Sequence, residues 1–152
     1  MKKFSLLLFI LFTEMTWVNA QITKVELLTK TPRLYERTDW TIQLTGIWEN
    51  PYLTQDVALD MQLTTPSGKS ITLPCYFESG VSGNASLWKA RFAPQEKGTY
   101  QYHFQFSKNG QLSSTSNSAS FSVKSSDKDG LLHMKDNWTF QYDNGKPFRG
   151  VG

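Results

Sequence analysis

Acidic side chains are the first candidates for chemistry in this sequence. General acid–base cleavage of a glycosidic bond, for example, needs two carboxyl groups about 5 to 9.5 Å apart on either side of the bond. Four carboxylates stand near apolar stretches, at Glu49, Asp56, Asp60 and Glu78. The sequence alone does not place any two of them at that distance. We therefore expect them to be turn and surface carboxylates, and we expect the chain itself to be non-catalytic.

The other reactive side chains indicate no catalytic or metal site. His103 and His133 are the only histidines, and they form no Ser-His-Asp order. Cys75 is the only cysteine, so no internal disulfide can form, and we interpret it as a small buried hydrophobe. The run from Asp127 to Gly130 is similar to the start of a calcium loop, but it lacks the later glutamate. We expect no metal and no cofactor.

Aromatic residues make up 14% of the chain and divide into two groups. Those that alternate with polar residues are typical of one buried strand face. This predicted core signature consists of Trp40, Trp88, Phe92, Tyr100, Tyr102 and Phe104. A second group lies at predicted strand ends and loops, where a ring can be exposed for binding or docking. Its members are Trp48, Tyr52, Tyr76 and Phe77.

Short strands separated by turn residues must position these side chains. Alternation or β-type composition predicts strands at residues 22–28, 40–45, 57–64, 70–77, 88–92, 100–106 and 121–123, with a polar loop at 113–118. Because Pro94 and Gly98 separate two of these runs, residues 88–106 are interpreted as a β-hairpin. About seven strands without helical periodicity predict an all-β, immunoglobulin-like antiparallel β-sandwich.

Composition divides the chain into four parts. Lys2 and Lys3 precede an apolar run, and the stretch ends in small residues at Ala20. This pattern predicts a signal peptide at 1–20. We therefore expect an exported protein without a membrane segment after cleavage. We expect the sandwich at 21–124, a linker at 125–130, and a C-terminal hairpin at 131–152 that begins a further domain. The net charge is +3, but the basic residues are scattered, which excludes a nucleic-acid surface.

Several motifs together resemble a known family. In order, they are TGIWENPY from Thr45, Asp56-Val57, Pro66-Ser67-Gly68, WKARFAP from Trp88 and GTYQY from Gly98. They resemble the domain of unknown function 5060, an immunoglobulin-like module that stands before the catalytic barrel of many bacterial polysaccharide-degrading enzymes. The tail, with Asn144 to Phe148, is similar to the entry of an apiosidase-like (β/α)8 domain. This resemblance implies a bacterial periplasmic or extracellular protein.

Three interpretations of function remain open. In the first, the module docks against the catalytic barrel of its own enzyme, and Trp48, Tyr52 and Phe77 form an apolar patch continuous with the tail hairpin. In the second, it binds polysaccharide through a row of coplanar exposed rings. In the third, the chain is a truncated gene product without an independent role.

Overall fold

The computed structural model describes residues 20–150, so the predicted signal peptide lies outside the described residues except for Ala20. Twelve strands form in this part of the chain. They are β1 (Gln21–Leu27), β2 (Thr38–Thr45), β3 (Val57–Thr64), β4 (Ser70–Pro74), β5 (Tyr76–Gly80), β6 (Ala85–Phe92), β7 (Gly98–Lys108), β8 (Gln111–Thr115), β9 (Ala119–Val123), β10 (Leu132–Met134), β11 (Phe140–Tyr142) and β12 (Pro147–Phe148). No helix among the described residues is long and apolar enough to cross a membrane.

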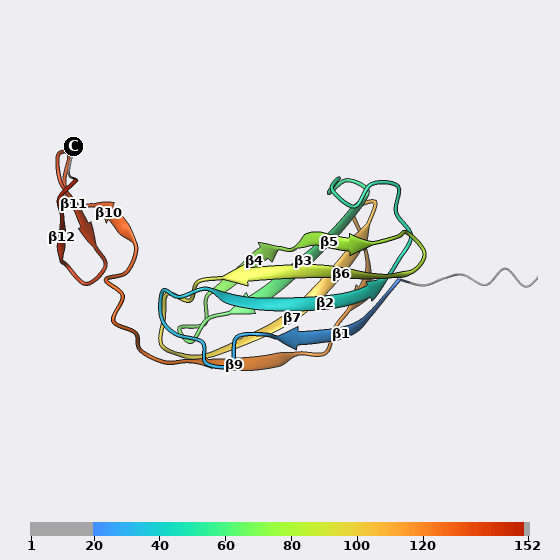
Figure 1. Cartoon of the computed structure of the whole chain (residues 1–152), viewed down its shortest axis with the longest axis horizontal. Helices are drawn as coiled ribbons and strands as arrows, with labels where there is room; N and C mark the ends of the chain where they lie inside the picture. Colours follow the sequence, from blue (N-terminus) through green and yellow to red (C-terminus); the bar gives the residue numbers. More distant parts are fainter. Residues whose placement is uncertain (1–19, 151–152) are drawn as a thin grey trace, which may run out of the picture.

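The first nine strands form two antiparallel sheets that pack face to face (Figure 1). One sheet has the order β1-β2-β6-β5, and the other has the order β4-β3-β7-β8 with β9 also paired to β7. These orders correspond to the ABED and CFG sheets of an immunoglobulin domain. The predicted all-β, immunoglobulin-like sandwich is therefore confirmed, with nine strands in place of about seven.

Alternate residues of both sheets fill the space between them. The buried core includes Trp40, Trp88, Tyr100, Tyr102 and Phe104, whereas Phe92 is only partly buried and packs against this core. Burial of such large rings removes much apolar surface from water, which is the main favourable contribution to folding. Because a single cysteine cannot form an internal disulfide, the stability of the sandwich depends on this core.

The hairpin predicted for residues 88–106 is wrong. β6 pairs with β2 and β5 in one sheet, while β7 pairs with β3, β8 and β9 in the other. The link at residues 93–97 thus crosses between the sheets, and the rings of Phe92 and Tyr100 meet with their centroids 5.7 Å apart. Alternation reveals which face of a strand is buried but not which strand lies beside it.

The predicted strand 70–77 is two strands in different sheets. β4 pairs with β3, whereas β5 pairs with β6, and the change of sheet occurs at Cys75. Pro74 has no N–H to donate to a ladder, which favours a break at this point. The N–H of Cys75 bonds to the carbonyl of Leu59 at 2.8 Å. Burial raises the pKa of the Cys75 thiol, so the thiolate is disfavoured.

Part of the predicted loop 113–118 is also a strand. β8 pairs with the second half of β7 and β9 with its first half, so β7 carries both partners along one edge. The polar composition of β8 concealed this pairing, because its residues are mostly exposed and show no apolar alternation. Because β8 and β9 pair with different halves of β7, the loop between β8 and β9 lies beside the middle of β7.

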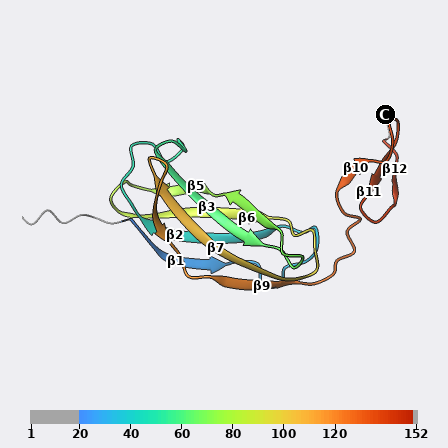
Figure 2. The same cartoon turned by 180° about the vertical axis from the view of Figure 1, so that it is seen from behind.

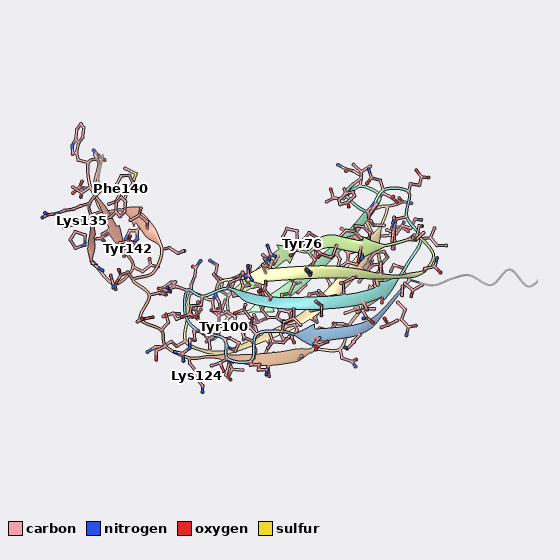
Figure 3. All side chains as sticks on the ribbon, viewed as in Figure 1. Tyr76, Tyr100, Lys124, Lys135, Phe140 and Tyr142 are labelled. Carbon is pink, nitrogen blue, oxygen red and sulfur yellow. The ribbon has the colours of Figure 1, made fainter. Side chains whose placement is uncertain are left out.

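The last three strands form a small separate sheet of order β10-β11-β12, which we call the tail sheet. It stands apart from the sandwich in both views (Figures 1 and 2). Phe140 and Tyr142 lie on β11, and the ring of Tyr142 packs against that of Phe148 at 6.0 Å (Figure 3). The tail sheet leaves apolar surface uncovered, since Trp138 is 90% exposed.

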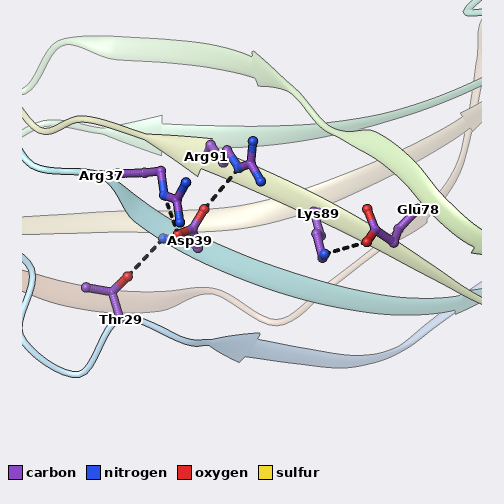
Figure 4. A network of polar contacts seen from close by, with 6 residues as sticks. All are labelled: Thr29, Arg37, Asp39, Glu78, Lys89 and Arg91. Carbon is purple, nitrogen blue, oxygen red and sulfur yellow. Dashed lines mark hydrogen bonds and ion pairs between the residues drawn. The ribbon is translucent and has the colours of Figure 1, made fainter.

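A network of charges covers the outer face of β2, β5 and β6 (Figure 4). Asp39 pairs with Arg37 at 2.8 Å and with Arg91 at 3.2 Å, and Glu78 pairs with Lys89 at 2.6 Å. Exposed pairs of this kind contribute roughly 0 to 1 kcal/mol each. The network links three neighbouring strands and keeps this sheet face polar.

Candidate functional site

The sandwich has two ends, which we define by the strand β7. The exit end carries Gly98, residues 28–37 and Lys124, where the chain leaves the sandwich. The distal end carries Lys108 and the loop 46–56, since Lys108 Nζ donates to the Ile47 carbonyl and the N–H of Asn109 to that of Asp56. At about 3.3 Å per residue, the eleven residues of β7 separate these ends by roughly 33 Å.

The four candidate aromatic residues lie together on the distal half of the sandwich, but their exposure differs. Trp48 is buried, with only 6% of its surface exposed, in contrast to the expected exposed ring. Its ring packs edge to face on Phe77 and Trp88. The backbone N–H of Trp48 donates to Ser82 Oγ at 2.9 Å. Tyr52 is 75% exposed and is the ring most open to a ligand.

The rings do not form a flat platform. The planes of Tyr52 and Phe77 meet at 90°, those of Phe77 and Trp88 at 76°, and those of Trp48 and Phe77 at 67°. Tyr76 has no aromatic partner among these rings, and the guanidinium of Arg91 lies 5.3 Å from its ring centroid. The coplanar row expected for a polysaccharide-binding face is therefore absent among these four residues.

This aromatic cluster is not continuous with the tail sheet. Tyr52 belongs to the distal loop, whereas the tail sheet follows Lys124 at the exit end (Figure 1). The expectation that Trp48, Tyr52 and Phe77 would join the tail in one patch is wrong. This arrangement could not be predicted, because the direction of each strand depends on pairings far apart in the chain.

Hydrogen bonds hold the distal loop in place. Asp56 Oδ2 accepts the N–H groups of Glu49 and Asn50 at 2.6 and 2.7 Å. Asn50 Oδ1 in turn accepts the N–H of Tyr52 at 3.0 Å. Such Asx turns fix a loop without regular secondary structure. The backbone under the exposed Tyr52 ring is thus ordered in advance of any binding.

The four carboxylates have different environments. Asp56 caps the distal loop, Glu78 pairs with Lys89, and Glu49 is exposed. Asp60 lines a small cleft beside Pro74 and Tyr52, and partial burial raises its pKa. Among residues 20–150, no group of three or more His, Cys, Asp or Glu side chains could hold a metal ion.

The exit end contains a tyrosine corner, which sequence reasoning missed. The hydroxyl of Tyr100, near the start of β7, accepts the N–H of Glu96 at 3.0 Å. Immunoglobulin-like domains use such a tyrosine to fix the crossing between their E and F strands. Burial raises the pKa of the Tyr100 hydroxyl. A tyrosine two residues after Gly98 could have given the signal.

The linker is bonded to the sandwich on one side and to the tail sheet on the other. Ser126 Oγ donates to the Leu34 carbonyl at 2.6 Å, and Arg33 pairs with Lys124 in a parallel bridge. Further on, Asp129 accepts bonds from Asn144 at 2.9 Å and from Lys146 at 2.7 Å. The carboxylate of Asp129, in the run that is similar to the start of a calcium loop, therefore holds the tail turn.

Comparison with known proteins places this architecture in a family. The model of the Domain of unknown function (DUF5060) matches residues 31–107, which is half of the chain. The chain belongs to the DUF5060 family. The matched part of this DUF5060 chain begins in the exit-end loops and runs through β2 to most of β7, so it contains the tyrosine corner, the sheet crossing at Cys75 and the distal loop.

A solved structure shares this fold. It is described as the "crystal structure of a putative glycoside hydrolase" from Bacteroides vulgatus ATCC 8482, and it matches with a TM-score of 0.57 at 14% identity. The match covers 79% of the DUF5060 chain but only 21% of that protein, so the chain corresponds to about a fifth of its length. No curated protein matches the sequence significantly.

Proposed function

We propose that this DUF5060 chain is the accessory module of an exported polysaccharide-degrading glycoside hydrolase, and that it orients the catalytic domain of the same enzyme. The structural neighbour, described as a "putative glycoside hydrolase" and about five times longer than the matched part, supports the enzyme class. Orientation is the role that the geometry favours most. The partner is the catalytic barrel, and the module itself performs no chemistry.

The single observation that carries the orienting role is the bonded linker. Ser126 ties the linker to the sandwich and Asp129 ties it to the tail sheet, while Gly130 allows the linker to approach Asp143 of the tail closely. A Cβ at Gly130 would lie 2.6 Å from Asp143, and its φ of +100° disfavours other residues. Burial, and after it the nearby carboxylate of Asp143, raises the pKa of Tyr35. A linker with these contacts transmits orientation better than a free chain.

Backbone ¹⁵N relaxation on the purified chain tests the orienting role. We expect the sandwich and the tail sheet to share one rotational correlation time. Ser126→Ala removes the bond to the Leu34 carbonyl and should shorten the correlation time of the tail sheet alone. Ser125→Ala is the matched control, because the bond recorded at Ser125 uses its carbonyl. Independent tumbling of the two parts in the unmodified chain would contradict the proposal.

Two further measurements test the enzyme context. Incubation with plant and algal polysaccharides should release no reducing sugar, because Asp56 is engaged in the distal loop and Glu78 in an ion pair with Lys89. Reading the gene past the codon for Gly152 should show continuation into a barrel domain. A stop codon there would favour the alternative that the chain is a truncated product.

A second candidate function is glycan binding, and one observation favours it. Tyr52 exposes three quarters of its surface on a loop that is already ordered. Because the neighbouring rings are perpendicular, any glycan contact must be local and cannot extend along a platform.

A further inference from the structure

A small cleft opens on the side of the sandwich, between the edges of the two sheets. It forms where the chain crosses from β4 to β5, and the distal loop closes it from above. Its volume is about 160 Å³, and Tyr52, Asp60, Tyr76, Phe77 and Trp88 are among the residues that line it. Pockets for larger ligands usually measure about 300 to 1,000 Å³. The cleft therefore suits a single small ring.

Aromatic rings form its walls as a corner. Tyr52 stands perpendicular to Phe77 with the ring centroids 5.5 Å apart, and Phe77 stands in turn against Trp88 at 5.4 Å. One ring therefore offers a face where the next offers an edge. A ligand with an apolar face and polar edges fits such a corner, because each edge can turn away from the apolar wall.

A carboxylate is the main charged group in this lining. The raised pKa of Asp60 is attributed to burial alone, with no contribution from a charged neighbour. The ion pairs of the described residues do not include Asp60. A partly buried acceptor without a cation gains most from a ligand that donates hydrogen bonds. An anionic ligand would be repelled.

The backbone that carries Tyr52 needs no ordering on binding. The Asp56 carboxylate accepts the backbone N–H groups of Glu49 and Asn50, and the side-chain oxygen of Asn50 accepts the backbone N–H of Tyr52. Trp48 is anchored beneath the loop by Ser82. Preorganisation of this kind lowers the entropic cost of binding a small ligand.

We propose that this cleft binds one neutral sugar ring, with an apolar face of the ring against Tyr52 and Phe77 and its hydroxyl groups donating to Asp60. A pyranose combines the apolar face with the O–H donors that the lining requires. That the ligand is a unit of a glycan rests on the proposed function. Since the ring is small, we expect a dissociation constant on the order of 1 mM.

An NMR titration of the ¹⁵N-labelled full chain tests the proposal. The probes are glucose, galactose and xylose, their short β-linked oligosaccharides, glucuronic acid as the anionic counterpart, and choline as a cation. At least one neutral sugar should shift amide signals at Tyr52, Asp60 and Phe77. Glucuronic acid should bind more weakly than glucose. The oligosaccharides distinguish an internal unit from a free sugar or a chain end.

Substitutions separate the cleft from the rest of the surface. Tyr52→Ala and Asp60→Asn should each weaken binding about tenfold or more, and Tyr52→Phe should retain it, because the ring face remains. Trp138→Ala is the matched control, since Trp138 is the most exposed of the large apolar residues but lies in the tail sheet. Amide spectra identify any variant that has lost its fold.

Four results would overturn the sugar site. These are no shift with any neutral sugar, shifts confined to residues outside the cleft, tighter binding of choline, or undiminished binding by folded Tyr52→Ala. None of them affects the linker experiment with Ser126→Ala. The orienting role can therefore fail or survive independently of this site.

Discussion

At the scale of single residues, a few polar atoms in or beside the core form hydrogen bonds that hold its large aromatic side chains and the neighbouring backbone in place. Tyr100 combines a buried ring with a hydroxyl that meets the N–H of Glu96. Ser86 plays a related part, since its Oγ accepts the indole N–H of Trp88 at 3.1 Å and donates to the Leu44 carbonyl at 2.9 Å. Paired polar atoms of this kind satisfy the buried indole of Trp88, whereas the buried indole N–H of Trp40 has no hydrogen-bond partner among the described residues.

Removal of the Tyr100 hydroxyl should destabilise the sandwich modestly. Tyr100→Phe leaves the ring in place but deprives the Glu96 N–H of its acceptor, so we expect a loss of about 1 kcal/mol in the free energy of unfolding. Urea denaturation followed by tryptophan fluorescence measures it. Tyr102→Phe is the matched control on the same strand face, because no hydrogen bond is recorded for its hydroxyl. Equal losses in both variants would refute the role of the corner.

At the scale of elements, the turns of the tail sheet depend on ionised aspartates. Hydrogen bonds from Lys146 and then Asn144 lower the pKa of Asp129. The N–H of Trp138 and the hydroxyl and N–H of Thr139 lower the pKa of Asp136. These carboxylates hold the two turns that define the small sheet.

The tail sheet should therefore lose order in acid before the sandwich does. A carboxyl whose pKa is depressed by folding contributes stability above its unfolded pKa, about 3.9, and loses it as the pH falls through the lower folded value. We expect amide signals at residues 129–148 to broaden or collapse between about pH 4 and pH 2. In Asp136→Ala, which removes the acceptor of the Trp138 and Thr139 N–H groups, the effect at the Trp138 turn should already be present at pH 7. Simultaneous loss of sandwich and tail signals would contradict this prediction.

Sequence reasoning predicted the strands of the sandwich correctly where the signal is local. The alternation in 40–45, 57–64 and 100–106 predicted β2, β3 and most of β7. It failed for the hairpin and for β8, where the partner strand decides the outcome. It also expected Trp48 to be exposed, because a residue just beyond a strand shows no alternation even when a distant ring such as Phe77 covers it. The cleft at Asp60 could not be predicted, since it arises from the meeting of two sheet edges.

At the scale of the whole molecule, an aromatic cluster ties the two sheets together. Phe121 of β9 stacks on Tyr100 at 5.1 Å and meets Trp40 of the opposite sheet edge to face at 5.2 Å. Trp40 also contacts Tyr102 at 5.7 Å. In antibody domains a disulfide joins the sheets near this position. In this chain, contacts among aromatic rings connect the two sheets instead.

Truncation of Phe121 should affect the whole sandwich. Phe121→Ala leaves a cavity between the sheets, so we expect a loss of about 3 to 5 kcal/mol in the free energy of unfolding. Phe121→Leu, which refills part of the space, should cost clearly less. Calorimetry should show one transition at a lower temperature in each variant. Two separate transitions would mean that the sheets are not cooperatively linked.

The first residue of β1 and the last residue of β9 lie at opposite ends of the sandwich, which has a mechanical consequence. Gln21 pairs with Thr45 at the distal end, and Val123 pairs with Gly98 at the exit end. A force that pulls the two ends of the domain apart therefore runs along β1 and β9 and loads their ladders in shear. All hydrogen bonds of a ladder then resist together, whereas peeling would break them one at a time. The sandwich is built to bear tension along its long axis.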